Sequence, residues 1–363
     1  MHPTRPRAAL RRLDTLPRLA TTALVAGLTA GTLALALPAT SASASASASA
    51  SASAKTTSAA SLAGVTITFG DQLKEFQTIF KATNALEGAL YTVDWANFIG
   101  GPPVIAAETS GSVDLGDMAE TPVVFAQAAG DPVKVVAATV GTTTNTSPYG
   151  ILVPAGSPIK SVAQLKGHTV AVQEGTVEQY YLVQALAHAH VPYGGVNLDN
   201  LPVTSASTAV TNGQVDAAVV SQPLIALDEA TGKVRQISSG AGLVQTLGYL
   251  TASDAALANP QKKEAIADFI NRFYKAQAIL AKDPALAAQT YSSTFGISLA
   301  EAEQAVASVQ AKGTPITPAI ISYQQNEANT FQKLGLLQTH LNVASSFDLP
   351  FNKVVARAAG LQS

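Results

Sequence analysis

Four turns hold the residues best suited to chemistry, because each combines glycine, hydroxyl, amide or acidic residues with the start of a predicted helix. The turns cover residues 69–72, 97–103, 116–122 and 173–176. At such places the free backbone N–H groups and the helix dipole favour a sulfonate, carboxylate or phosphate. One charge-assisted hydrogen bond contributes about 1.5–3 kcal/mol. The turns indicate a site for a small organic anion, and ordinary turn and cap residues are the alternative interpretation.

Three glutamates near these turns point in the opposite direction. Carboxylates such as those of Glu120, Glu174 and Glu178 complement a helix N-terminus themselves and repel an anionic ligand unless they point away. A neutral or cationic ligand therefore stays open as an alternative.

The sequence lacks several common catalytic and metal-binding motifs. There is no cysteine, which excludes disulfides, thiolate metal sites and cysteine nucleophiles. No His-Glu-x-x-His, phosphate-binding loop or Gly-x-Ser-x-Gly motif occurs. His188 and His190 are two positions apart in a predicted helix and are poorly placed to share a metal ion. We therefore expect no catalytic residue, no metal and no cofactor.

Aromatic residues provide a second kind of candidate contact. Tyr149 and Tyr180 could present to a ligand a ring with an apolar face and a polar hydroxyl. Core packing is the better explanation for Tyr181 and for Trp95, the single tryptophan.

The N-terminal segment has the layout of a secretory signal. Five arginines lie within residues 5–18, and an uncharged, mainly apolar stretch covers residues 19–37. Small residues follow, with cleavage choices near Ala42 or Ala44. We therefore predict a signal peptide over residues 1–42, with an uncleaved membrane anchor as the alternative.

The segment after the signal has too little apolar mass to fold. Residues 43–61 are rich in Ser and Ala and are predicted to form a flexible linker. Arg11-Arg12 leaves twin-arginine export open. Because there is no cysteine to carry a lipid, we expect an exported protein in the periplasm, the cell envelope or the medium that is not anchored through cysteine.

Charge and length limit the possible partners. Removing five arginines from the 22 basic residues, and Asp14 from the 24 acidic ones, leaves 17 basic and 23 acidic residues. No basic block occurs, so we expect no nucleic-acid partner. No later apolar run approaches the roughly 18 residues that a membrane span needs. A mature chain of about 300 residues buries a large core, commonly in two domains.

The elements that position the four turns alternate between strand and helix. This pattern runs over residues 65–140, starts again over residues 150–251, and gives way to helices from Asp254 onward. It predicts two α/β lobes with mostly parallel sheets, followed by a helical segment. Such sheets bind ligands beyond the carboxyl ends of their strands, which is where the turns lie.

Several boundaries follow from cap and turn residues. Thr121 is the predicted N-cap of a helix ending at Ala129, and Thr176 that of a long helix running to about His190. A short strand is predicted over residues 112–115, and a helix over residues 299–312.

Six segments follow one another along the chain: residues 100–103 (GGPP), 111–116 (GSVDLG), 121–130 (TPVVFAQAAG), 151–154 (ILVP), 157–167 (SPIKSVAQLKG) and 169–172 (TVAV). In this order and spacing they resemble the aliphatic sulfonate-binding proteins of ABC importers. The wider group binds sulfonates, taurine, nitrate and thiamine precursors, and the resemblance covers about residues 65–345. Ser221-Gln222-Pro223 departs from it, since Trp-Asp-Pro is common there.

The resemblance implies an α/β fold: a two-lobed clamshell like the type II periplasmic binding proteins, with mixed sheets and a C-terminal helical segment. One lobe would span residues 62–148 plus 249–363 and the other residues 149–248, with hinges near Pro148 and Gly248. The ligand contacts that we predict are Asp71, Gln72, Gly100, Gly101, Glu120, Thr121, Tyr149, Gly175, Thr176 and Gln222.

The function that the resemblance implies is that of an extracytoplasmic solute-binding protein. It would be a monomer that captures a small organic anion, such as an aliphatic sulfonate, and delivers it to an ABC permease and its ATPase. Alternatives are a binder of thiamine-precursor-like or other nitrogen compounds, and an envelope sensor or scavenger. An enzyme of the same fold is disfavoured, because a desulfinase of this type uses a cysteine nucleophile.

Overall fold

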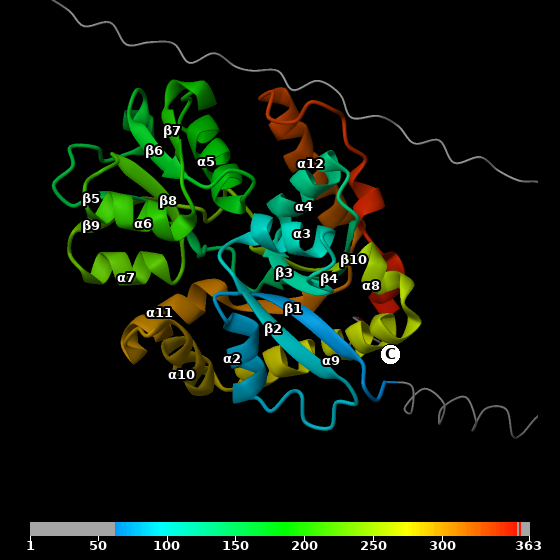
Figure 1. The fold of residues 1–363 in the computed structure, drawn as a ribbon. Helices are drawn as coiled ribbons and strands as arrows, with labels where there is room; N and C mark the ends of the chain where they lie inside the picture. Colours follow the sequence, from blue (N-terminus) through cyan, green and yellow to red (C-terminus); the bar gives the residue numbers. More distant parts are fainter. Residues whose placement is uncertain (1–61, 354–355, 357–363) are drawn as a thin grey trace, which may run out of the picture. The chain divides into compact units, whose positions relative to one another are not determined.

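Two mixed β-sheets with helices on their faces make up the part of the chain that the structure describes (Figure 1). The computed structural model describes residues 62–353 and residue 356. The predicted signal peptide and linker, residues 1–61, lie outside the described residues.

The first sheet has the strand order β11-β4-β10-β3-β1-β2. Its strands are β1 (Thr66–Gln72), β2 (Thr92–Phe98), β3 (Leu115–Ala119), β4 (Val133–Gly141), β10 (Leu247–Ser253) and β11 (Ala311–Thr314). β1 pairs in parallel with β2 and β3, whereas β10 runs antiparallel between β3 and β4. The carboxyl ends of β1, β2 and β3 therefore meet at one edge.

The second sheet has the order β7-β6-β8-β5-β9. Its strands are β5 (Tyr149–Pro154), β6 (Thr169–Val172), β7 (Asn197–Asn200), β8 (Ala217–Ser221) and β9 (Val234–Ser239). β6 is parallel to β7 and β8, and β5 is antiparallel to β8 and β9. The start of β5 is thereby paired with the carboxyl end of β8, where Tyr149 lies opposite Ser221.

Helices follow most of the strands. They are α2 (Glu75–Ala82), α3 (Gly101–Thr109), α4 (Glu120–Ala129), α5 (Val177–His188), α6 (Val203–Thr211), α7 (Leu224–Ala230), α8 (Asp254–Ala258), α9 (Pro260–Lys282), α10 (Pro284–Phe295), α11 (Leu299–Val309) and α12 (Pro318–Lys333). Short 3-10 turns cover Val162–Leu165, Tyr193–Gly195, Val343–Ser346 and Leu349–Phe351. None of the helices in the described part of the chain is long and apolar enough to cross a membrane.

Apolar cores lie on both faces of each sheet, as expected for strands that are buried on both sides. On one face of the first sheet, β1 packs against α2 and α9 through aromatic residues, and Phe69 stacks on Phe269 at 4.8 Å. On the other face α3, α4 and α12 form a second core. In the second sheet α5 covers one face and α6 the other. Trp95 packs edge-on against Phe69 and Phe80, so its predicted core role is confirmed.

The chain passes between the two sheets twice. Residues 142–148 join β4 to β5, and residues 240–246 return from β9 to β10. Gly248, near which the second hinge is predicted, lies inside β10.

Three predicted boundaries were wrong because tertiary contacts override the local pattern. α4 begins at Glu120, after an extended Ala119, so Thr121 lies inside the helix and is not its N-cap. The strand predicted over residues 112–115 lies at Leu115–Ala119, where it pairs with β1 and β10. The helix predicted to reach Lys312 ends at Val309, because residues 311–314 pair with β4.

The start of α3 is as predicted. Gly100 has a φ of 84°, a conformation that favours glycine, and prolines follow in the first turn of the helix. Thr176 directly precedes α5, also as predicted, but its hydroxyl donates to the Gln173 carbonyl at 2.7 Å and accepts no hydrogen bond from the helix amides.

Candidate functional site

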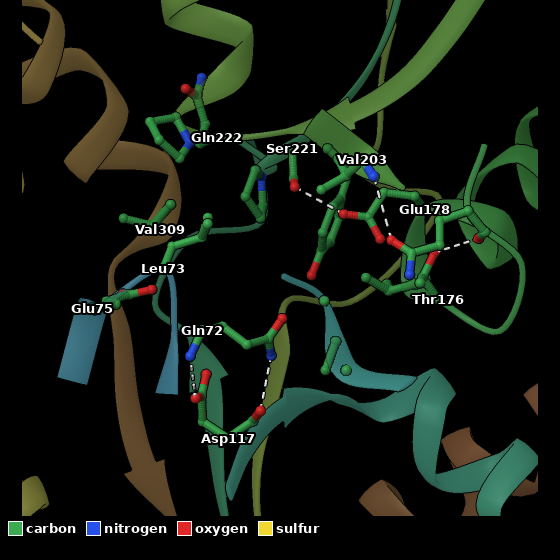
Figure 2. A pocket seen from close by; sticks show the side chains of 18 of the residues that line it. Gln72, Leu73, Glu75, Asp117, Thr176, Glu178, Val203, Ser221, Gln222 and Val309 are labelled. Carbon is green, nitrogen blue, oxygen red and sulfur yellow. Dashed lines mark hydrogen bonds between the residues drawn. The ribbon is translucent and has the colours of Figure 1, made fainter. Parts of the chain in front are cut away.

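A cavity of about 210 Å³ is lined by residues that both sheets position (Figure 2). Gln72 is the last residue of β1, and Asp117 lies in β3. Tyr149 begins β5, and Ser221 ends β8. The first residues of α3 and α5 also line it. The cavity thus lies beyond the carboxyl ends of parallel strands, where α/β sheets bind ligands.

Six of the ten predicted ligand contacts line this cavity. They are Gln72, Gly100, Gly101, Tyr149, Thr176 and Gln222. A side chain at Gly101 would collide with Pro122, because an added Cβ would lie 2.4 Å from its Cγ. Glycine at this position therefore lets the start of α3 lie close to α4.

Two of the other predicted contacts, Asp71 and Gly175, support neighbouring structure. Asp71 is fully buried, and its carboxylate accepts hydrogen bonds from the Phe76 and Gln77 amides in α2, at 3.0 and 2.8 Å. Burial raises the pKa of Asp71 to about 6, although these bonds oppose the shift. The Gly175 amide donates to the Gln179 side chain at 2.8 Å, which closes the turn before α5.

Glu120 and Thr121, the remaining two, are fully buried behind the cavity lining and do not line it. The Thr121 hydroxyl donates a hydrogen bond to the carboxylate of Glu327 on α12. Burial and the nearby Glu327 raise the pKa of Glu120 well above its usual range. The bond between Thr121 and Glu327 connects α4 to α12. Contact of Glu120 and Thr121 with a ligand stays a prediction.

The sequence reasoning missed several residues that line the cavity. Glu75 comes from the first turn of α2, Tyr291 and Phe295 from α10, and Val309 from the end of α11. Glu75 could have been noticed as the first acid after the turn at residues 69–72. The α10 and α11 residues follow that turn by more than 200 positions, and no local motif indicates them.

Hydrogen bonds hold the polar lining in place (Figure 2). The backbone amide of Gln72 donates to the Asp117 carboxylate at 3.1 Å, and the Gln72 side chain donates to the Asp117 carbonyl at 2.8 Å. Across the cavity, the Ser221 hydroxyl donates to Glu178 at 2.8 Å. The ends of β1 and β3 are thus tied together, and so are β8 and α5.

The cavity lining carries three acids and no Lys, Arg or His. The acids are Glu75, Asp117 and Glu178. Burial, with a smaller contribution from Asp71, raises the pKa of Glu75 to about 7. Burial, followed by the charges of Asp71 and Glu75, raises the pKa of Asp117 well above its usual range. Near neutral pH, part of this acidic lining is therefore protonated when the cavity is empty.

The chain is similar to known proteins both in sequence and in structure. The family model described as "NMT1/THI5 like" matches residues 101–287. The chain is 34% identical over 161 residues to a protein named "Putative aliphatic sulfonates-binding protein" from Escherichia coli (strain K12), covering 44% of this chain and 50% of the relative. It is 29% identical over 153 residues to the "Taurine-binding periplasmic protein" of the same organism, covering 42% and 46%. The chain thus spans about half the length of the curated relatives that it matches.

A solved structure is similar to this chain over a longer range than the curated relatives are. The alkanesulfonate-binding protein SsuA from Xanthomonas axonopodis pv. citri, bound to MOPS, is similar with a TM-score of 0.72 and 27% identity. The similarity covers 78% of this chain and 98% of that chain. The fold class predicted from the sequence is therefore confirmed, as is the resemblance to sulfonate-type binding proteins.

Proposed function

Because the chain belongs to the NMT1/THI5-like family, we propose that it is the solute-binding protein of an ABC importer. It would be exported, bind one small molecule between two lobes, and pass it to a permease driven by an ATPase. The lobes would be residues 62–148 plus 249–363 and residues 149–248.

The observation that carries the proposal is a cavity whose lining comes from both sheets. Gln72 and Asp117 belong to the first sheet, and Tyr149 and Ser221 to the second. A ligand that contacts both sides favours the conformation in which the two sides are close together, and only such differential contact can shift the equilibrium. The connections at residues 142–148 and 240–246 would act as the hinges.

The names of the relatives supply the first class of ligand to test, small organic sulfonates. In that case the sulfonate would bind at the starts of α3 and α5, where Gly101 and Val177 line the cavity. Binding without chemical conversion is proposed, since a desulfinase-type reaction needs a cysteine nucleophile and the chain has none.

Thermal unfolding against a ligand panel tests this function. The panel holds alkanesulfonates, taurine, nitrate, aromatic sulfonates, carboxylates and thiamine precursors. A ligand at 100 times its Kd stabilises the protein by about 2.7 kcal/mol, which raises the unfolding temperature by about 2 °C or more. We expect at least one such rise, and we expect it to shrink in Gln72→Ala, which changes the cavity, but not in Gln77→Ala, which lies outside it. A rise of equal size in both variants would contradict the site.

A further inference from the structure

Three acids that line one cavity without a basic partner suggest that the ligand carries a positive charge. In the described residues neither Glu75, Asp117 nor Glu178 forms an ion pair. Two neighbouring cavities share part of this lining, and the basic residue that they contribute is the exposed Lys312. A buried carboxylate without a compensating charge is costly, so a positive charge brought by a ligand would relieve that cost.

A purely structural explanation accounts for only part of this arrangement. Glu75 and Glu178 lie in the first turns of α2 and α5, where acids complement the helix dipole. However, the Glu178 side chain reaches across to β8, where the Ser221 hydroxyl donates to its Oε1. Glu178 is 9% exposed and still lines the cavity. Its carboxylate is therefore oriented by a neighbour and not by the helix amides alone.

An apolar side chamber adjoins the cavity. It has a volume of about 150 Å³ and lies among α2, α9, α10, α11 and β11. It shares Glu75, Tyr291, Phe295 and Val309 with the main cavity. Half of its twelve remaining lining residues are apolar, including Ile79, Leu280, Ala287 and Val306. Continuity through four shared residues makes the chamber a place for a part of the same ligand.

We propose that the ligand carries a protonated nitrogen, which binds among Glu178, Asp117 and Glu75, and an apolar arm, which enters the side chamber. The inference rests on the proposed solute-binding function and narrows its ligand class. The nitrogen can belong to a free amine or to an aminosulfonate whose acidic group binds at the helix starts. A free amine and an aminosulfonate both carry the cation, and calorimetry with matched compounds separates them.

Isothermal titration calorimetry with matched compounds tests the charge. The series are n-alkylamines, n-alkane-1-sulfonates, ω-aminoalkane-1-sulfonates and n-alkan-1-ols of equal chain length. We expect a nitrogen-bearing series to bind at least about tenfold more tightly than the sulfonates and alcohols. Tightest binding by the aminosulfonates would identify the zwitterion, and tightest binding by the amines would identify the simple cation.

Variants separate the acids from general effects on the fold. Glu178→Gln should weaken binding of the nitrogen-bearing compounds at least about tenfold, because a charge-assisted bond is lost. Glu303→Gln, at an exposed position of α11 outside the three cavities, should leave the Kd unchanged. A second variant, Asp117→Asn, should act in the same direction as Glu178→Gln.

The length of the ligand's alkyl chain tests whether the side chamber takes part in binding. Each methylene that enters it should strengthen binding about threefold to fourfold. Ala287→Leu or Thr294→Leu, which fill the chamber without touching the main cavity, should remove this gain for long amines and spare short ones.

Different negative results would count against the inferred ligand class and against the proposed solute-binding function. Tight binding by sulfonates alone, unchanged or improved in Glu178→Gln, would overturn the inference and leave the solute-binding function standing. If the affinity of the unmodified protein does not depend on the length of the ligand's alkyl chain, the proposal that an apolar arm enters the side chamber would be wrong. Binding by no compound of any series, together with an unresponsive unfolding panel, would count against the proposed function itself.

Discussion

The Ser221 hydroxyl at the end of β8 donates a 2.8 Å hydrogen bond to the Glu178 carboxylate in the first turn of α5. Both residues line the cavity between the two sheets. The bond fixes a carboxylate where a ligand would meet it, and it links the strand that ends at the cavity to the helix that begins there. This pair connects the fold of the second sheet to the proposed chemistry of the site.

Removing the hydroxyl should loosen this carboxylate without removing its charge. Ser221→Ala is expected to weaken binding of a nitrogen-bearing ligand by about threefold to tenfold, since a typical hydrogen bond contributes about 0.5–1.5 kcal/mol. The loss should be smaller than in Glu178→Gln. Calorimetry measures both values, with Ser239→Ala, an exposed serine at the end of β9, as the control. Equal affinity in Ser221→Ala and in the unmodified protein would show that the bond does not position Glu178 for binding.

The two threonines predicted to contact the ligand should behave differently. Thr121→Val leaves the buried Glu327 carboxylate without its donor, and we expect a loss of about 1–3 kcal/mol in the free energy of unfolding with little change in Kd. Thr176→Val alters the cavity lining, so we expect a change in Kd of at least threefold with a smaller change in stability. Chemical denaturation and calorimetry on the same preparations distinguish the two. A lower affinity in Thr121→Val at unchanged stability would place Thr121 in the site after all.

Glu108 should make the protein less stable as the pH rises. It is 1% exposed on α3, and the Thr251 hydroxyl donates to its two oxygens at 2.9 and 3.0 Å. Burial raises the pKa of Glu108 from 4.5 to about 8. The folded-state pKa lies above the unfolded value, so this stability is fully present below about pH 4.5 and is lost as the pH rises through about 8.

Glu108→Gln tests that assignment because glutamine keeps the shape and does not titrate. We expect the variant to lose less stability than the unmodified protein between pH 5.5 and about pH 8.5, by an amount of the order of 1 kcal/mol or more. Urea unfolding at several pH values provides the measurement. Parallel pH profiles for the two proteins would refute the assignment.

Ligand binding should also depend on pH, through Glu75. Its pKa is about 7, and the titratable groups around it are Asp71, Asp117 and Tyr291. Because a protonated carboxyl cannot attract a cation, affinity for a nitrogen-bearing ligand should rise between pH 5.5 and 8.5. Binding near pH 7 should release protons, which calorimetry detects in buffers of different ionisation enthalpy. An affinity that falls over this range, with proton uptake, would indicate an anion among these carboxyls.

The sequence could predict those parts of the site that depend on local chemistry. The glycine pair at residues 100 and 101 marks the start of α3, because a positive φ and close approach to Pro122 both require it. Thr176 marks the start of α5 for a similar local reason. The alternation of strands and helices was sufficient to predict two α/β lobes, but the prediction of mostly parallel sheets was wrong. In the first sheet β10 and β11 pair antiparallel to their neighbours, and in the second sheet β5 pairs antiparallel to β8 and β9. The position of β10 depends on the return of the chain from the second sheet, which no local pattern encodes.

Other parts of the site could not be predicted from the local sequence. Thr121 resembles a helix cap in sequence, but the N-cap of α4 is Ala119, two residues earlier, and the Thr121 side chain lies against α12. Tyr291 and Phe295 reach the cavity because α10 packs against α2 and α11, a contact that no nearby motif encodes. β11 pairs with β4, and Gly313 lets this strand lie close to the Tyr274 ring, because an added Cβ would lie 2.2 Å from ring atoms. A helical pattern alone cannot reveal that contact.

Whether one solute is held between the two sheets can be tested by a distance measurement with double electron–electron resonance. The chain has no cysteine, so Lys81→Cys on α2 and Lys166→Cys before β6 would give two spin labels at unique, exposed positions. The tightest ligand from the calorimetric series is added to saturation. We predict that the distance distribution shifts and narrows with one-to-one stoichiometry, and that Glu178→Gln requires more ligand for the same shift. An unchanged distribution at ligand concentrations that calorimetry shows to be saturating would contradict the account.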